Sequence, residues 1–111
     1  MKKELRMKVF NKLNNHCAYC GKIIKYDEME IDHLFPKSQG GTNEVENLLP
    51  ACRRCNFYKS DLVVEKFRNA IRTINGRLKK IYIFKVALDF GIIEIKPFNG
   101  VFYFEKKGDM K

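Results

Sequence analysis

The sequence predicts a small α+β domain that a structural metal ion helps to stabilise. Its 111 residues fit one domain. Apolar residues at helical spacing predict helices, and short apolar runs between polar turns predict strands. All four cysteines fall in two Cys-x-x-Cys pairs, and small domains often need a metal to fold. We therefore expect one domain over residues 1–111, with its chemistry in residues 17–60 and a C-terminal extension in residues 61–111.

The first half predicts one helix, two strands and a loop. Residues 1–15 predict a short basic helix, with Leu5, Val9 and Leu13 at helical spacing. Residues 17–21 form a cysteine knuckle that closes at a glycine. Residues 23–26 and 29–33 predict strands, and residues 36–43 have the composition of an ordered loop. Residues 42–49 predict a short helix.

The second half is predicted to be mostly helical. One helix is expected to begin near Cys52, and another spans residues 61–74, with Gly76 as its C-cap. Phe57 and Tyr58 are expected to pack in the core, with stacking on bases as the alternative. Residues 77–90 favour a helix, because they are apolar almost all round. The β-rich runs that flank Asn99-Gly100 predict a type I′ hairpin.

The charge of the chain favours a polyanionic partner. Lys and Arg number 22 against 13 Asp and Glu, which gives a formal net charge of +9. A small protein this basic usually binds nucleic acid, and a membrane surface is the less favoured reading because no basic amphipathic helix stands out. Basic residues gather in residues 2–12, 53–59 and 66–85. Arg53 and Arg54 lie inside the second cysteine pair and are our first choice for contacts with a phosphate backbone.

We expect a cytoplasmic protein. The N-terminal residues lack the apolar core of an export signal, and no apolar run approaches the length of a membrane span. Cysteines stay reduced in the cytosol, so metal ligation is favoured over disulfides.

The two cysteine pairs predict a closed zinc site. The first pair is Cys17 and Cys20, and the second is Cys52 and Cys55. The two pairs are separated by 31 residues. Two-residue spacing lets both thiolates of a pair reach one ion, and four thiolates make a structural, tetrahedral site. The alternatives are free thiols, disulfides or a redox protein, but no thioredoxin-like context accompanies the pairs. His16 is expected to lie near the site rather than to bind the ion.

Four further polar residues predict a catalytic site: Asp32, His33, Asn47 and Asn56. If a helix begins near Cys52, then Cys52, Asn56 and Lys59 share one face of it. A strand ending at Asp32-His33 can then bring Asp32 close to Asn56. Carboxylate and amide oxygens suit Mg²⁺. Neighbours on a regular strand point to opposite faces, so Asp32 and His33 share a site only if the strand ends or distorts there.

Three stretches, "CAYC", "IDHLFPKSQGG" and "NLLPACRRCNFYKS", together resemble the HNH endonucleases. The resemblance covers residues 17–60 and implies a small ββα-metal finger with a structural zinc. The family's first histidine matches His33, its central asparagine matches Asn47, and its last position matches Asn56. That last position is histidine in many members, so this chain resembles an H-N-N variant. Imidazole tolerates softer ions at this position, whereas an amide favours hard cations.

The resemblance implies hydrolysis of double-stranded DNA. His33 would act as general base, and Asp32 and Asn56 would hold Mg²⁺ or another divalent cation. Asn47 would brace the histidine loop, and Lys59 would hold a phosphate oxygen. Products would carry 5′-phosphate and 3′-hydroxyl ends, and relatives occur in phages, bacterial restriction systems and mobile elements.

Two alternatives remain open at this point. A zinc-stabilised nucleic-acid-binding module that has lost catalysis would need the cysteines but not the Asp32-His33 pair with Asn56. The apolar residues 81–104 either complete the core or form a homodimer face.

Overall fold

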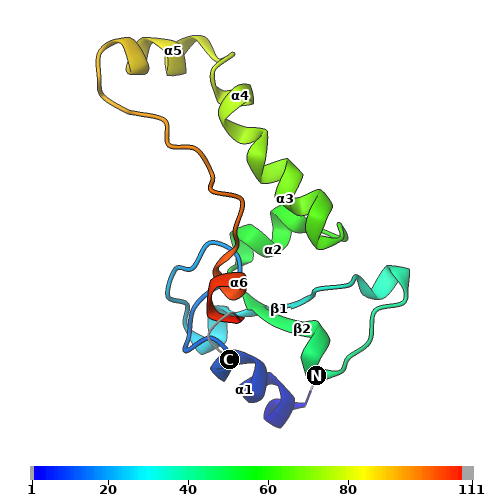
Figure 1. Ribbon diagram of the computed structural model, residues 1–111. Coiled ribbons are helices and arrows are strands. Elements are labelled where there is room, and N and C mark those ends of the chain that lie inside the picture. The colour runs from blue at the N-terminus through cyan, green and yellow to red at the C-terminus, as the bar shows by residue number, and fades with distance from the viewer. Residues whose placement is uncertain (1, 109–111) are drawn as a thin grey trace. The chain divides into compact units, whose positions relative to one another are not determined.

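A computed structural model of the chain describes residues 2–108 (Figure 1). The chain divides into two compact units. The first combines Met1–Val64 with Val101–Lys111, and the second is Glu65–Gly100. A two-stranded sheet with several helices confirms the predicted α+β class. The expectation of one domain over residues 1–111 stays a prediction.

The centre of the first unit is a two-stranded sheet followed by a helix. Strands β1 (Glu30–His33) and β2 (Leu48–Ala51) pair antiparallel, with Asp32 opposite Leu49 and His33 opposite Leu48. Helix α2 (Arg53–Lys59) follows β2 almost directly and packs on β1. Figure 1 shows β1 and β2 side by side, with α2 leaving the end of β2. This order is the ββα arrangement that the resemblance implies.

Strand β2 is buried along its whole length. Pro50 lies within it and has no N–H to donate, which a strand tolerates at the edge of a sheet. Its carbonyl instead accepts a hydrogen bond of 2.8 Å from the backbone N–H of Ala18. The cysteine knuckle is therefore attached to the outer edge of the sheet.

Helix α1 (Lys3–Asn11) packs on β2, and a lysine just beyond its end ties it to the rest of the unit. Its apolar anchor, Val9, is fully buried. Just beyond its end, Lys12 donates hydrogen bonds to the carbonyls of Val45 and Leu48, at 2.8 and 2.7 Å. Part of the positive charge in residues 2–12 is thus structural. The helix is shorter than the predicted 1–15, because residues 12–15 form turns.

Two local predictions in this unit are wrong. Residues 23–26 form no strand, since Ile23 makes only an isolated bridge with His16 and Tyr26–Glu28 form a 3-10 turn. Residues 42–49 form no helix beyond the 3-10 turn Val45–Asn47, because the chain then enters β2. Pairing with β1 outweighs the weak local preference for a helix there.

The predicted C-terminal β-hairpin is also wrong. Residues 92–100 form no regular element, and α6 (Tyr103–Gly108) follows them. The Glu105 carboxylate accepts a hydrogen bond from the N–H of Phe102 at 2.8 Å, a contact that favours the start of a helix. The N–H of Phe104 donates to the carbonyl of Ala18 at 2.8 Å, so this segment docks on the cysteine knuckle instead of pairing with itself.

The second unit is helical. It contains most of α3 (Val64–Arg72), all of α4 (Ile74–Leu78) and all of α5 (Tyr82–Asp89). The predicted helices are present but broken, and Gly76 lies within α4 rather than at a C-cap. Buried Arg68 pairs with Glu65 and donates to the Gly100 carbonyl at 2.7 Å, which ties the two ends of the unit together. Among residues 2–108, no helix has both the length and the apolar character that crossing a membrane requires.

Candidate functional site: a thiolate cluster beside a polar pocket

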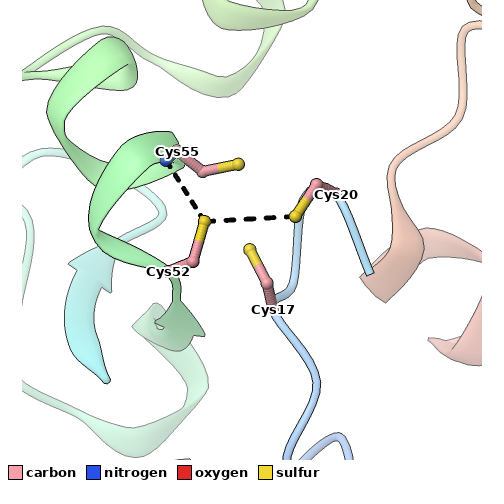
Figure 2. A group of neighbouring side chains, drawn as sticks. All are labelled: Cys17, Cys20, Cys52 and Cys55. Atoms are coloured by element: carbon pink, nitrogen blue, oxygen red, sulfur yellow. Dashed lines mark hydrogen bonds between the residues drawn. The ribbon is translucent and has the colours of Figure 1, made fainter. Parts of the chain in front are cut away.

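The four cysteines converge on one point (Figure 2). Cys17 and Cys20 come from the knuckle, whereas Cys52 and Cys55 come from the start of α2. Their four sulfur atoms all lie within 4.8 Å of one another. Bonds of about 2.3 Å to a tetrahedral zinc ion would separate the sulfurs by about 3.8 Å. The distance of 4.0 Å between the Sγ atoms of Cys20 and Cys52 fits such an ion.

The electrostatics of the cluster agree with a cation site. Hydrogen bonds from the thiols of Cys20 and Cys55 lower the pKa of Cys17. The contact with Cys17 in turn raises the pKa of Cys20 and that of Cys55. Four sulfurs this close cannot all become thiolates unless a cation neutralises them, and a divalent ion is the usual solution.

Local backbone geometry forms both halves of the cluster. Gly21 closes the knuckle with φ +81°, and its N–H donates to the Cys17 carbonyl at 3.0 Å. A Cβ at Gly21 would lie 2.8 Å from the Tyr103 ring, so glycine is required there by both conformation and space. On the other side, the Cys52 sulfur caps α2 by accepting from the N–H of Cys55 at 3.3 Å.

A pocket with several polar lining residues lies in the same unit, and α2 contributes Cys55 to the cluster and Asn56 to the pocket. The volume of the pocket is about 240 Å³. It is lined by Ile31, Asp32, His33, Pro36, Lys37, Ser38, Asn56, Ser60 and Asp61. Three of the four predicted catalytic residues thus share one cavity. His33 is the last residue of β1. Because the strand ends there, Asp32 and His33 can both line the pocket, as a shared site requires.

Asp32 is buried and has two partners. The hydroxyl of Tyr19 donates to Oδ2, and the ammonium of Lys59 lies 3.1 Å from the same oxygen and 3.3 Å from Oδ1. Burial raises the pKa of Asp32, and the hydrogen bond from Tyr19 and the charge of Lys59 oppose that rise. Burial also raises the pKa of Tyr19, as does the negative charge of Asp32. Tyr19 therefore stays a hydrogen-bond donor.

His33 is held by a residue that the sequence did not single out for this task. Its Nε2 lies 2.8 Å from Oδ1 of Asn43. Since an amide oxygen only accepts, Nε2 carries the proton, and Nδ1 is left free to accept one. No sequence motif marks this contact; the only signal is the position of Asn43 just after the Gly40-Gly41 turn.

Asn47 fastens the loop between His33 and Asn43. Its side-chain oxygen accepts from the N–H of Phe35 at 2.8 Å. Its amide nitrogen donates to the carbonyls of Phe35 and Thr42, at 3.1 and 2.9 Å. The two ends of the loop are therefore joined through one side chain. Tight packing inside the loop accompanies this, since a Cβ at Gly41 would collide with the Phe35 carbonyl.

Asn56 reaches the pocket from the first full turn of α2, one residue after Cys55. The thiolate cluster thus fixes the turn that presents this amide. Together Asp32 and Asn56 provide a carboxylate and an amide oxygen, the ligand types that hard divalent cations prefer, and the pocket leaves room for waters. The ligand types present suit a hard divalent cation, and its binding by Asp32 and Asn56 stays a prediction.

The three predicted DNA-contacting residues lie in different surroundings. Arg54 is exposed, and Arg53 is exposed but pairs with Glu30 at 3.4 Å. Lys59 is fully buried, and its ammonium also donates to the His33 carbonyl at 3.1 Å. A direct contact of Lys59 with phosphate stays a prediction. Tyr19 also contacts Asp32, and the sequence did not predict this role, because a tyrosine inside a cysteine knuckle carries no specific signal.

Comparison with known proteins identifies relatives of the region that carries the site. The family model described as "HNH endonuclease" matches residues 17–72. The CRISPR-associated endonuclease Cas9 of Corynebacterium diphtheriae is 47% identical over 49 residues, which are 43% of this chain and 4% of that protein. A Bacillus subtilis prophage-derived protein assigned to the HNH endonucleases is 31% identical over 65 residues, covering 51% of this chain and 28% of the relative.

A solved structure shows the same fold. The type II-C Cas9 enzyme of Actinomyces naeslundii matches with a TM-score of 0.54 and 30% identity, over 59% of this chain and 8% of that one. The chain thus spans only a small part of the relatives that it matches. These comparisons do not support the homodimer face that the sequence left open for residues 81–104.

Proposed function

Because the chain belongs to the HNH endonuclease family, we propose that it is a metal-dependent endonuclease that hydrolyses phosphodiester bonds of double-stranded DNA. One observation carries the proposal: Asp32, His33 and Asn56 line a single pocket next to a thiolate cluster. Each side chain is of the type that its proposed task needs: Asp32 and His33 come from the end of β1, and Asn56 comes from α2.

His33 is the general base. A neutral imidazole nitrogen can take a proton from water, and histidine is the most common general base in enzymes. The contact between Nε2 and Asn43 leaves Nδ1 as the accepting atom. Water loses a proton to Nδ1 and attacks phosphorus; the bond between phosphorus and the 3′ oxygen breaks, and the leaving 3′ oxygen takes a proton from solvent. The products are a 5′-phosphate and a 3′-hydroxyl.

Asp32 and Asn56 would hold the divalent cation. Mg²⁺ or a similar ion bound there would stabilise negative charge on the phosphate and the leaving oxygen. Tyr19 and Lys59 already bind Asp32, but two carboxylate oxygens offer about four acceptor positions. At least one acceptor position therefore remains for an ion. The two partners, Tyr19 and Lys59, hold the Asp32 carboxylate in one orientation.

Zn²⁺ held by the four cysteines has a structural task. Four thiolates close the coordination sphere, so no position is left for substrate. The ion would join the knuckle to the start of α2, and so hold Asn56 in the turn that lines the pocket.

Asn43 and Asn47 are positioning residues. Asn43 sets which ring nitrogen of His33 carries the proton, and Asn47 fixes the loop that carries Asn43. The net charge of +9 supports a nucleic-acid partner, with exposed Arg53 and Arg54 as phosphate contacts. A cytoplasmic location remains our expectation.

A second function is favoured by one specific observation. The buried ion pair between Lys59 and Asp32 satisfies both side chains without any metal. A zinc-stabilised nucleic-acid-binding module without catalysis would keep such a pair. Incubation of the zinc-loaded protein with supercoiled plasmid and Mg²⁺ separates the two functions, since only the nuclease produces nicked DNA.

A further inference from the structure

A second hollow lies on another side of α2 from the catalytic pocket. Its volume is about 730 Å³. It is lined by Lys22, Ile23, Ile24, Glu28, Cys52, Arg53, Arg54 and Phe57, and we call it the knuckle groove. Arg53 and Phe57 are four residues apart and therefore share one helix face, whereas Asn56 and Ser60 line the catalytic pocket from the neighbouring face.

The apolar part of the knuckle groove faces solvent. The Phe57 residue is 88% exposed and Ile23 is 74% exposed. The expectation that Phe57 packs in the core is therefore wrong. A large aromatic ring left this open beside a groove is typical of an interaction site.

The charge around the groove selects a polyanion. Three cations line it, against the single carboxylate of Glu28. Lys22 and Arg54 are exposed, and neither has an ion-pair partner among residues 2–108. An open aromatic face between unpaired cations is the combination that binds unpaired nucleotides, since the base stacks on the ring while the phosphates meet the cations.

We propose that the knuckle groove binds an unpaired nucleotide of the DNA substrate, with its base stacked on Phe57 and its phosphates against Lys22 and Arg54. The volume lies within the range of about 300–1,000 Å³ that small-ligand sites usually have. The inference rests on the proposed nuclease function and adds a substrate class to it. Bases inside an intact duplex are already stacked, so the site selects DNA with an unpaired base near the cut.

A single tryptophan provides the test, because the chain has none. Phe57→Trp is made in a His33→Ala background, so that bound DNA stays intact, and zinc-loaded protein is titrated without added divalent cation. The probes are three short duplexes: one fully paired, one with an unpaired nucleotide, and one with an abasic site at that unpaired position. Tyr82→Trp, at a position that is 80% exposed in the second unit, is the matched control.

We expect the unpaired base to quench the fluorescence of the Phe57→Trp protein, and the abasic and fully paired duplexes to do so weakly. The Tyr82→Trp protein should not distinguish the three probes. Equal quenching by all three duplexes, or none while gel shifts still show binding, overturns the proposal. Stronger quenching by an acidic peptide than by any DNA would also overturn it.

The single variant Phe57→Ala separates this inference from the nuclease proposal. Stacking of one base on an aromatic ring typically changes affinity by about 5- to 150-fold. We expect Phe57→Ala to weaken binding of the duplex with the unpaired base by such a factor, and of the paired duplex much less. If the variant cuts both duplexes as wild type does, the groove proposal fails and the nuclease proposal stands.

Discussion

The ammonium of Lys59 lies 3.1 Å from Oδ2 of Asp32, and both side chains are almost completely shielded from solvent. Lys59 comes from the last turn of α2 and Asp32 from β1, so the pair links the helix to the strand residue that lines the pocket. Burying two charges costs more desolvation free energy than leaving them at the surface. Each buried charge therefore depends on its partner.

Loss of either partner should destabilise the first unit. Asp32→Leu or Lys59→Met alone leaves one buried charge unpaired, which typically costs about 3–5 kcal/mol of unfolding free energy. The double variant removes both charges and should lose less than the two single losses added together. Urea unfolding of the zinc-loaded proteins near neutral pH measures all four free energies. Strictly additive losses would show that the two groups do not depend on each other.

Removal of zinc should unfold the knuckle. Four cysteines at this spacing can all be thiolates only around a cation, so we expect one zinc ion per chain and a large drop in melting temperature after chelation. Cys20→Ser should lower both zinc content and melting temperature, whereas Ser38→Ala, in the pocket lining, should change neither. Metal analysis and thermal denaturation check this, and unchanged melting of a stripped sample would contradict a structural ion.

The contact between Asn43 and His33 should decide the tautomer of the ring. Asn43→Leu removes the acceptor for Nε2–H, so both tautomers should appear in ¹⁵N NMR spectra of the His33 ring. Activity should fall about tenfold or more, because a positioned general base contributes on the order of 10²–10⁴. Asn43→Asp keeps an acceptor oxygen and should keep the Nε2–H tautomer. An unchanged ring spectrum in Asn43→Leu would remove Asn43 from the account.

Asn47 should control the order of the loop after His33. In Asn47→Ala the N–H of Phe35 loses its acceptor, and such a bond contributes about 0.5–1.5 kcal/mol. Hydrogen exchange at Phe35 should therefore accelerate by about 2- to 13-fold, while exchange in α1 stays the same. Asn11→Ala, on α1, serves as the control, because its exposed side chain lies outside this loop. Equal exchange at Phe35 in both variants would mean that Asn47 does not brace the loop.

Patterns of residue spacing predicted which side chains lie close together better than they predicted the secondary structure. The Cys-x-x-Cys pairs fixed which side chains meet, and the helix that begins after Cys52 follows from that pairing. The position of Asn56 one residue after Cys55 placed it correctly in the pocket. Such spacing depends on local backbone geometry, which a sequence records directly.

Long-range contacts account for what the sequence did not predict. The predicted helix at residues 42–49 gave way to β2 because those residues pair with β1. The predicted hairpin gave way to α6 because Phe104 bonds to Ala18 in the knuckle. Tyr19 and Asn43 acquire their roles only from partners that lie 13 and 10 residues away in the sequence. None of these contacts has a periodic signature.

Cleavage of supercoiled plasmid in Mg²⁺ by two zinc-loaded proteins, wild type and His33→Ala, tests the central claim most directly. We predict that wild type nicks the plasmid, and that His33→Ala with equal zinc content and melting temperature is slower by at least about 10². A wild-type protein that cuts no DNA with any divalent cation, or a His33→Ala protein that cuts as fast as wild type, would contradict the claim that the imidazole beside Asp32 and Asn56 performs hydrolysis.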